Sequence, residues 1–326
     1  MREIIIKAPA KVNLFLKVLR KRPDGYHDIE TIFEKVALFD TIRMKRAKTG
    51  IKVRSDYPGL PKGKENLVYQ AAQMMQEACG KPLAVEIELE KKIPVCAGLG
   101  GGSSDAASVL LGLKKLFGLR IPEEKMRALA RKIGADVPFF LSKSAWAVGR
   151  HIGDRLEKIK TDMKLWHLFV VPPFSVSSKE AYEWRDKAGK VLRSLWRSRW
   201  SRHYARSGST LLRKVGEKAD ISDALDAIRK DDAHSLGRSL YNDLQGLSLA
   251  RSGLFGEFKE LLLDNGACGA LISGSGPVLF GIYKEEREVV RSQEKIERLI
   301  AEKGKTWQVL TAATHNSNEA VTSRTK

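Results

Sequence analysis

The alternation of apolar and polar positions predicts strands in both halves of the chain. A period of two runs through residues 10–18 and again through residues 83–89, as expected for strands with one buried face. Short apolar runs predict further buried strands at residues 168–171, 270–272 and 278–283. The last two flank the sequence SGSG, which is expected to connect them.

Apolar residues three and four positions apart predict helices between these strands. The expected helices cover residues 66–78, 106–113, 122–133, 178–184 and 254–261. Gly80 follows the first helix, and the sequence GADVP at residues 134–138 ends the third. Glycine commonly ends helices, and the residue before a proline avoids helical angles. The segment after Ala312 is polar, and we expect it to fray.

The length of the chain indicates two domains. At roughly 100–200 residues per domain, 326 residues are enough for two hydrophobic cores. The element pattern places the boundary after residue 152, which gives domains at residues 1–152 and 153–326. A hydrophobic fraction of 43% excludes an intrinsically disordered chain.

The cysteines and the N-terminal sequence indicate a cytoplasmic protein. Cys79, Cys96 and Cys268 lie far apart and have no CxxC spacing, which argues against a zinc site or a disulfide framework. The apolar run at residues 4–6 is too short for a signal peptide, and no apolar stretch is long enough to predict a membrane span. We therefore expect no membrane partner.

The formal charge of +19 suggests an anionic partner, and it is unevenly distributed. Residues 185–214 contain ten basic residues and one acidic residue. Aromatic residues are interleaved with this run: Trp184, Trp196, Trp200 and Tyr204. Arginine with aromatic residues is typical of nucleic-acid or acidic-membrane surfaces. A solvated helical insertion beside an anionic substrate explains the same residues, so nucleic acid stays the alternative partner for this segment.

A glycine-rich loop carries the strongest chemical signal. Residues 94–105 read PVCAGLGGGSSD and lie between a predicted strand and a predicted helix. Glycines let backbone N–H groups approach an anion, and the start of the helix adds its positive dipole end, so the loop suits phosphate. The plainer alternative is a flexible connection in which Ser103 or Ser104 caps the helix. The loop is not a Walker motif, because no lysine follows the glycines.

Five segments together resemble one enzyme family. They are PAKVNL at residues 9–14, GYH at residues 25–27, the glycine loop, GADVPFF at residues 134–140, and the segment at residues 269–280 containing SGSGP. Their order resembles the GHMP small-molecule kinases. Within that family they are similar to the branch that phosphorylates a cytidine-diphosphate-linked methylerythritol in the non-mevalonate isoprenoid pathway. The resemblance implies an α+β fold of two domains, the first like domain 2 of ribosomal protein S5 and the second ferredoxin-like.

The resemblance also implies a catalytic pair. Lys11 and Asp136 match a lysine–aspartate pair of the family. In that pair the carboxylate accepts the proton of the substrate's 2-hydroxyl, and the lysine keeps the carboxylate ionised. An opposite charge within about 4–6 Å favours an ionised carboxylate. Without the family, the plainer explanations are preferred, with Lys11 as a solvated strand residue and Asp136 as the cap of a helix that begins near Val137.

The implied substrate site recognises cytidine. Tyr26 and His27 match residues that stack on the base and hydrogen-bond its edge, and Tyr182 aligns with an aromatic residue on the other face of the base. Asn13 lies on the same strand face as Lys11 and is expected to reach the substrate hydroxyl. Ser178 precedes Tyr182 and belongs to the same expected site. Individually, these are also ordinary strand and loop residues.

The implied cofactors are ATP and Mg²⁺. The residues assigned to ATP are Asn66, Pro94, Gly98, Leu99, Gly100, Gly101, Gly102, Ser103, Ser104, Gly274 and Ser275. Ser104 is the expected hydroxyl beside Mg²⁺, and helix capping by the same residue is the alternative. The segment at residues 274–276 is explained almost as well by a tight turn between strands.

The sequence therefore predicts a cytoplasmic ATP-dependent kinase for the 2-hydroxyl of a small cytidine-diphosphate substrate. Two alternatives remain open. One is a GHMP kinase for another small alcohol, and the other is a catalytically inactive protein that keeps the fold and binds nucleic acid through residues 185–214.

Overall fold

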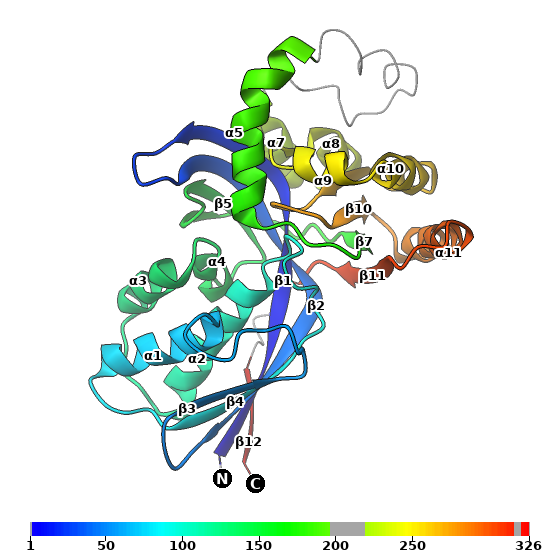
Figure 1. The fold of residues 1–326 in the computed structure, drawn as a ribbon. Coiled ribbons are helices and arrows are strands. Elements are labelled where there is room, and N and C mark those ends of the chain that lie inside the picture. Colours follow the sequence, from blue (N-terminus) through cyan, green and yellow to red (C-terminus); the bar gives the residue numbers. More distant parts are fainter. Residues whose placement is uncertain (1, 196–218, 316–320, 326) are drawn as a thin grey trace.

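Two β-sheets, each covered by helices, form the molecule (Figure 1). The computed structural model describes residues 2–195, 219–315 and 321–325. In the larger sheet the order is β12-β1-β2-β4-β3, with β5 attached to β2, β6 attached to β5 and β8 attached to β1. The smaller sheet has the order β11-β7-β10-β9 and is antiparallel throughout.

Two long antiparallel strands connect both parts of the molecule. They are β1 (Arg2–Lys21) and β2 (His27–Arg46), and each contains 20 residues. Figure 1 shows them running from the end where both termini lie to a hairpin beside α5 (Ser178–Leu195). Register shifts between Pro9 and Ala10 and between Asn13 and Phe15 mark bulges in the pair.

The prediction of one buried face for residues 10–18 is wrong. Asn13 and Phe15, on the face expected to be polar, are each only 1% exposed. Helix α2 (Gly101–Leu116) packs on one side of β1, and residues of β1 also share a core with Phe169 and Phe280 of the smaller sheet. Because the strand is covered on both faces, its period of two does not separate core from solvent.

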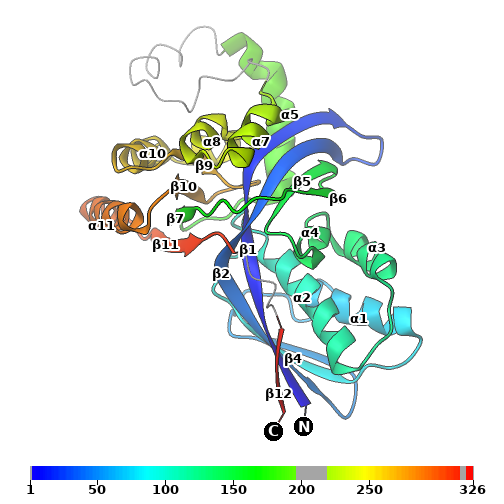
Figure 2. The same ribbon diagram turned by 180° about the vertical axis from the view of Figure 1, so that it is seen from behind.

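The first core lies between the larger sheet and four helices. These helices are α1 (Leu67–Cys79), α2, α3 (Glu123–Ile133) and α4 (Val137–Leu141). The sheet contributes β4 (Val85–Glu90) and β3 (Ile51–Ser55) beside β1 and β2. Figure 2 shows the helices gathered on one face of this sheet. The predicted helices at residues 66–78 and 122–133 agree with α1 and α3.

The smaller sheet is buried on both faces. Its strands are β7 (Trp166–Val171), β9 (Gly269–Ile272), β10 (Leu279–Tyr283) and β11 (Gln308–Ala313). Leu168 and Val170 face α10 (Leu254–Asp264) and α11 (Glu286–Glu302). Phe169 joins the core formed with α7 (Ile221–Arg229) and α8 (Ala233–Ser239). The apolar runs at residues 168–171, 270–272 and 278–283 correspond to these strands.

The expectation that the chain frays after Ala312 is wrong for the residues described there. Strand β11 continues to Ala313, and the Thr314 hydroxyl donates to Glu34 Oε1 at 2.6 Å. Strand β12 (Val321–Thr325) then pairs with β1 in the larger sheet. A buried polar contact and a strand partner far away in sequence hold this polar segment, and neither is visible in its local pattern.

The domain boundary near residue 152 stays a prediction. Strand β5 (Trp146–His151) pairs with β6 (Arg155–Lys158), so the larger sheet extends just past this point. Strand β8 (Tyr241–Asn242) also joins the larger sheet from far along the chain. Of the basic segment at residues 185–214, residues 196–214 lie outside the described residues. Within the part of the chain that is described, no helix is both long and apolar enough to cross a bilayer.

Candidate active site

Two glycine-rich loops, one from each sheet, meet backbone to backbone. Gly98 has φ +78°, and a β-carbon there would lie 2.1 Å from the Ser273 carbonyl oxygen. The Ser273 hydroxyl donates to the Gly98 carbonyl at 3.0 Å, and Gly276 N–H donates to the Ser273 carbonyl at 2.8 Å. No other residue type fits this approach at Gly98, because a side chain would displace the second loop.

The first loop ends at the start of α2, which presents free backbone donors. Gly100 is the N-cap with φ +70°, and α2 has no side-chain cap and no acidic residue in its first turn. The alternative in which Ser103 or Ser104 caps this helix is therefore wrong. The Ser104 N–H bonds to the Gly100 carbonyl at 2.9 Å, whereas its fully buried hydroxyl has no hydrogen-bond partner among the described residues. Unpartnered N–H groups at the positive end of a helix suit an anion.

Lys11 and Asp136 lie together beside this helix start. Lys11 Nζ is 3.3 Å from Asp136 Oδ2 and donates to Asn13 Oδ1 at 2.5 Å. The amide of Asn13 donates in turn to Thr31 Oγ1 at 2.8 Å. Phe33 packs its ring 5.4 Å from Lys11 Nζ. The lysine is thus held in one position by a carboxylate, an amide and an aromatic face.

The structure contradicts the two plainer explanations, a solvated Lys11 and a helix-capping Asp136. Lys11 is 4% exposed, so it is not a solvated strand residue. Asp136 occupies the N-cap position of α4 but makes no capping hydrogen bond with its side chain. Its carboxylate points to Lys11 instead and keeps 31% of the side chain accessible. An accessible carboxylate beside a buried cation is a suitable proton acceptor.

The second loop brings its backbone close to Lys11. A β-carbon at Gly274 would lie 3.1 Å from Asn13 Oδ1 and 3.4 Å from Lys11 Nζ. Asn242, which sequence analysis did not select, holds this loop by donating to the carbonyls of Ile272 and Gly274, each at 2.7 Å. No local pattern in the sequence indicates this role, because the contacts join residues about 30 positions apart.

A cluster of aromatic and polar residues lies at the β1–β2 hairpin. The rings of His27 and Tyr182 stack with centroids 4.8 Å apart and an interplanar angle of 18°. Tyr26 is 61% exposed at the neighbouring position. The Ser178 and Ser275 hydroxyls are 3.2 Å apart, which links α5 to the second loop. The structure therefore brings the predicted substrate residues to one edge, with Tyr182 resting on His27.

Asp186 is a member of this cluster that sequence analysis did not assign to the site. One of its carboxylate oxygens lies 3.0 Å from His27 Nε2. Burial, with the negative charge of Asp136 adding to it, raises the pKa of the Tyr182 hydroxyl. The Ser178–Ser275 contact joins the hairpin cluster to the second loop, and Gly274 of that loop lies beside Lys11, so the cluster and the Lys11–Asp136 pair border the same loop.

Asn66 lies near the first loop, and Pro94 is the first residue of that loop. Asn66 caps α1, since its Oδ1 accepts from Val68 N–H at 2.9 Å and its amide donates to the Pro61 carbonyl. The next residue, Leu67, approaches Gly102, where a β-carbon would lie 3.5 Å from Leu67 Cδ1. The start of α1 is therefore adjacent to the start of α2, although the side chain of Asn66 is already engaged.

A buried charge cluster fixes both ends of the first loop. Asp40 Oδ1 accepts from the backbone N–H groups of Lys92 and Ile93, at 2.6 and 2.8 Å. The Lys91 ammonium bonds to Asp40 and, at 2.6 Å, to Asp105 on α2. Burial, with the Asp40 charge nearby, raises the pKa of the Asp105 carboxyl to about 7 against the opposing effect of Lys91.

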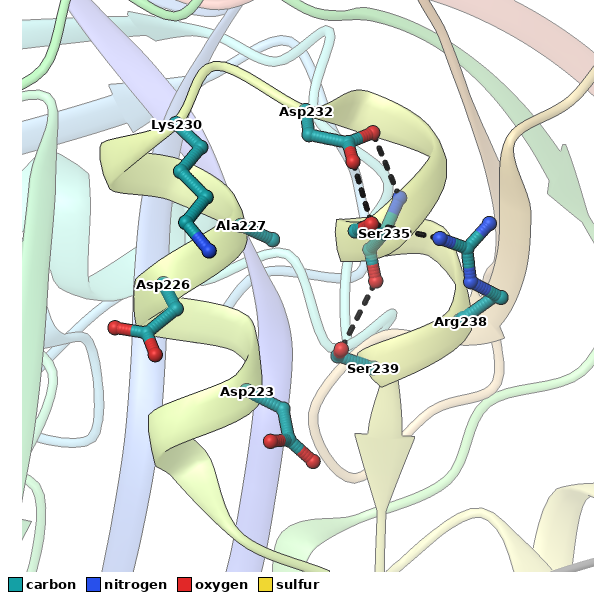
Figure 3. Close-up of a pocket in the computed structure, with 8 residues that line it drawn as sticks. All are labelled: Asp223, Asp226, Ala227, Lys230, Asp232, Ser235, Arg238 and Ser239. Atoms are coloured by element: carbon teal, nitrogen blue, oxygen red, sulfur yellow. Dashed lines mark hydrogen bonds between the residues drawn. The ribbon is translucent and has the colours of Figure 1, made fainter.

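A separate pocket of about 460 Å³ lies between α7 and α8 (Figure 3). Its polar groups bond mainly to one another. Asp232 accepts hydrogen bonds from the N–H and the hydroxyl of Ser235, and the Ser235 hydroxyl also accepts one from Arg238. None of its lining residues belongs to the glycine loops or to the strand that carries Lys11. We assign no function to it.

Comparison with known proteins shows matches along most of the chain. The family model for the GHMP kinases N terminal domain matches residues 66–144, and that for the GHMP kinases C terminal domain matches residues 224–301. A 4-diphosphocytidyl-2-C-methyl-D-erythritol kinase from Syntrophus aciditrophicus is 37% identical over 305 residues, which cover 93% of this chain and 96% of the relative. A kinase of the same name from Geobacter metallireducens is 38% identical, covering 91% of this chain and 95% of the relative.

Solved structures show the same architecture. A crystal structure of 4-(cytidine 5'-diphospho)-2C-methyl-D-erythritol kinase superposes with a TM-score of 0.72 at 29% identity, covering 96% of this chain and all of the other. A homoserine kinase from Cytophaga hutchinsonii superposes with a TM-score of 0.70 at 18% identity, covering 99% of this chain and 97% of the other. The second likeness concerns the fold alone.

The contact between the loops predicts a specific intolerance at Gly98. We expect Gly98→Ala to weaken ATP binding at least tenfold, because its β-carbon would push the second loop away from Lys11. Gly118→Ala is the control, since Gly118 has φ +63° with open space around it and should lose only about 1–2 kcal/mol of stability. Calorimetric titration and urea unfolding measure both quantities. Equal effects of the two substitutions on ATP binding would contradict the prediction.

The charge cluster predicts a pH-dependent stability. A carboxyl with a raised pKa in the folded state favours folding at low pH, and this contribution is lost as the pH rises from the unfolded value of about 4 to about 7. Asp105→Asn removes the titration and leaves Lys91 paired with Asp40. We expect this variant to gain roughly 1 kcal/mol or more relative to the wild type between pH 5 and pH 8. The free energy of unfolding of both proteins is measured in urea at each pH. If it changes with pH in the same way in both, the raised pKa of Asp105 is refuted.

Proposed function

The chain belongs to the GHMP kinases and, among them, to the 4-diphosphocytidyl-2-C-methyl-D-erythritol kinase family, and on that premise we propose its reaction. It transfers the γ-phosphoryl group of ATP to the 2-hydroxyl of 4-diphosphocytidyl-2-C-methyl-D-erythritol, a step of the non-mevalonate isoprenoid pathway. The observation that carries this proposal is the Lys11–Asp136 pair, 3.3 Å apart, beside the uncapped start of α2.

In the proposed mechanism Asp136 receives the proton of the substrate hydroxyl. The hydroxyl oxygen forms a bond to the γ-phosphorus, the bond from that phosphorus to the bridging oxygen breaks, and ADP leaves. Lys11 keeps Asp136 ionised and stabilises the charge that spreads over the transferred group. Asn13 orients the Lys11 ammonium, because its Oδ1 accepts from Nζ and its own amide is fixed by Thr31.

ATP is proposed to bind with its phosphates on the first loop. Backbone N–H groups of residues 98–103 and the positive end of α2 face them, while the Ser104 N–H is bonded to the Gly100 carbonyl. Gly274 and Ser275 extend this surface from the second loop, and Asn66 and Pro94 border the nucleotide on the other side. Mg²⁺ bound with ATP would neutralise phosphate charge. The Ser104 hydroxyl fits such an ion, because it is a buried oxygen in the first turn of α2 and has no hydrogen-bond partner in the part of the chain that the structure describes.

The cytidine end of the substrate is assigned to the hairpin. Tyr26 and Tyr182 offer aromatic faces to the base, and His27 offers a ring nitrogen to its edge. Ser178, bonded across to Ser275, lies between this end and the phosphate loops. The alternative of a nucleic-acid-binding protein gains no support, since the Lys11 pair and both glycine loops are intact.

A coupled ADP-release assay tests the proposed reaction. We expect turnover with 4-diphosphocytidyl-2-C-methyl-D-erythritol and ATP, and none with homoserine or mevalonate in its place. If the protein phosphorylates homoserine or mevalonate but not the cytidine substrate, it is a GHMP kinase with another substrate. No turnover with any of the three would overturn the proposal.

Substitution at Asp136 tests the catalytic assignment. We expect Asp136→Asn to reduce kcat by about 10²–10⁴-fold, because the amide cannot accept the hydroxyl proton. The Kd for ATP should change little, since the phosphates are held by backbone groups. Asp162→Asn, at an exposed carboxylate of the second half, is the control and should keep full activity. An unchanged kcat in Asp136→Asn would remove this residue from the mechanism.

A further inference from the structure

The carboxylate of Asp186 is bound to His27 in a way that the catalytic mechanism does not use. Its two oxygens lie 3.0 and 3.1 Å from His27 Nε2. Asp186 is on α5 and His27 begins β2, and Figures 1 and 2 both show α5 alongside the β1–β2 hairpin. The contact spans 159 positions in the sequence, so it exists only in the folded protein.

Two cations hold the Asp186 carboxylate in its charged form. Lys21 Nζ donates to it at 3.1 Å, and an Arg185 guanidinium nitrogen lies 3.6 Å away. Although partial burial opposes ionisation, hydrogen bonds from Lys21 and His27 lower the pKa of this carboxyl. An ionised carboxylate can only accept hydrogen bonds, so the proton in the contact must be on His27 Nε2.

The tautomer of His27 follows from this contact. In a neutral imidazole one nitrogen carries the proton and the other is an acceptor, so Nδ1 is left with a lone pair. Among the residues that the structure describes, Nδ1 of His27 has no hydrogen-bond partner. The ring is only 6% exposed and is stacked on Tyr182, so its plane and the direction of that lone pair are fixed.

We propose that Asp186 is a positioning residue that makes the hairpin site selective for cytosine over uracil, by holding His27 as the Nε2–H tautomer with Nδ1 as an acceptor. Cytosine carries an amino group at C4, which donates, whereas uracil carries a carbonyl there, which accepts. An acceptor nitrogen pairs with the first and repels the second. The proposal rests on the proposed function, in that it places the cytidine base beside His27.

The test compares nucleotide binding in the wild type and in Asp186→Asn. Kd values for CDP and UDP are measured by calorimetry, with the ATP site saturated by a non-hydrolysable ATP analogue. Asparagine keeps the size of the side chain, but its amide can accept from Nε2–H or donate to bare Nε2, so it no longer selects one tautomer. We expect the ratio of the UDP and CDP Kd values to fall by about tenfold or more in the variant.

A spectroscopic measurement follows the tautomer itself. Nitrogen chemical shifts of His27, assigned with a His27→Asn variant of ¹⁵N-histidine-labelled protein, report which ring nitrogen carries the proton. The wild type should show a protonated Nε2 and a bare Nδ1, and Asp186→Asn should show a mixture. Glu183→Gln, which removes an exposed charge from the same helix, is the matched control and should retain both the wild-type tautomer and the wild-type Kd ratio.

The possible results separate this proposal from the proposed function. The role of Asp186 is supported if the wild type prefers CDP and if Asp186→Asn loses both this preference and the Nε2–H tautomer. The role is overturned by a wild-type His27 protonated at Nδ1, by a wild type that binds UDP as well as CDP, or by a variant that keeps the CDP preference. Turnover of the cytidine substrate by the wild type in any of these cases leaves the kinase assignment standing.

Discussion

The close approach of two glycine-rich loops from different sheets is the constraint on which the site depends. Gly98 and Ser273 touch through backbone atoms, and this contact is possible only because Gly98 has no side chain and adopts a left-handed conformation. The contact sets the distance between the sheets at the place where Lys11 lies. It therefore positions the backbone donors at the start of α2, the second loop and the Lys11–Asp136 pair relative to one another.

Lys11 shows how the chemistry is built into this contact. Its ammonium is almost fully buried, and an unpaired cation there would cost several kcal/mol. Asp136, Asn13 and the face of Phe33 compensate for burial, and each comes from a different part of the chain. The same contacts leave the Asp136 side chain partly accessible. The ion pair thus compensates for a buried charge, and in the proposed mechanism it supplies the proton acceptor beside the first loop.

Much of this architecture is predictable from the sequence, because local patterns determine helix ends and glycine loops. Helix α1 covers Leu67–Cys79 with Gly80 as its C-cap, close to the predicted range of residues 66–78 and at the predicted glycine. The missed residues act through contacts with distant parts of the chain. Asn242 holds the second loop, Asp186 holds His27, and Lys91 joins Asp40 to Asp105. The predictions that Asn13 lies on an exposed face and that the C-terminal segment frays are wrong for the same reason. Both are polar, and both are covered by residues that are distant in sequence.

A crystal structure with a non-hydrolysable ATP analogue and 4-diphosphocytidyl-2-C-methyl-D-erythritol tests the central claim most directly. The account predicts that the analogue's phosphates lie on residues 98–104, that the 2-hydroxyl lies between Asp136 and the γ-phosphate, and that the cytosine lies against His27. Phosphates bound away from the start of α2, or a 2-hydroxyl out of reach of Asp136, would contradict it.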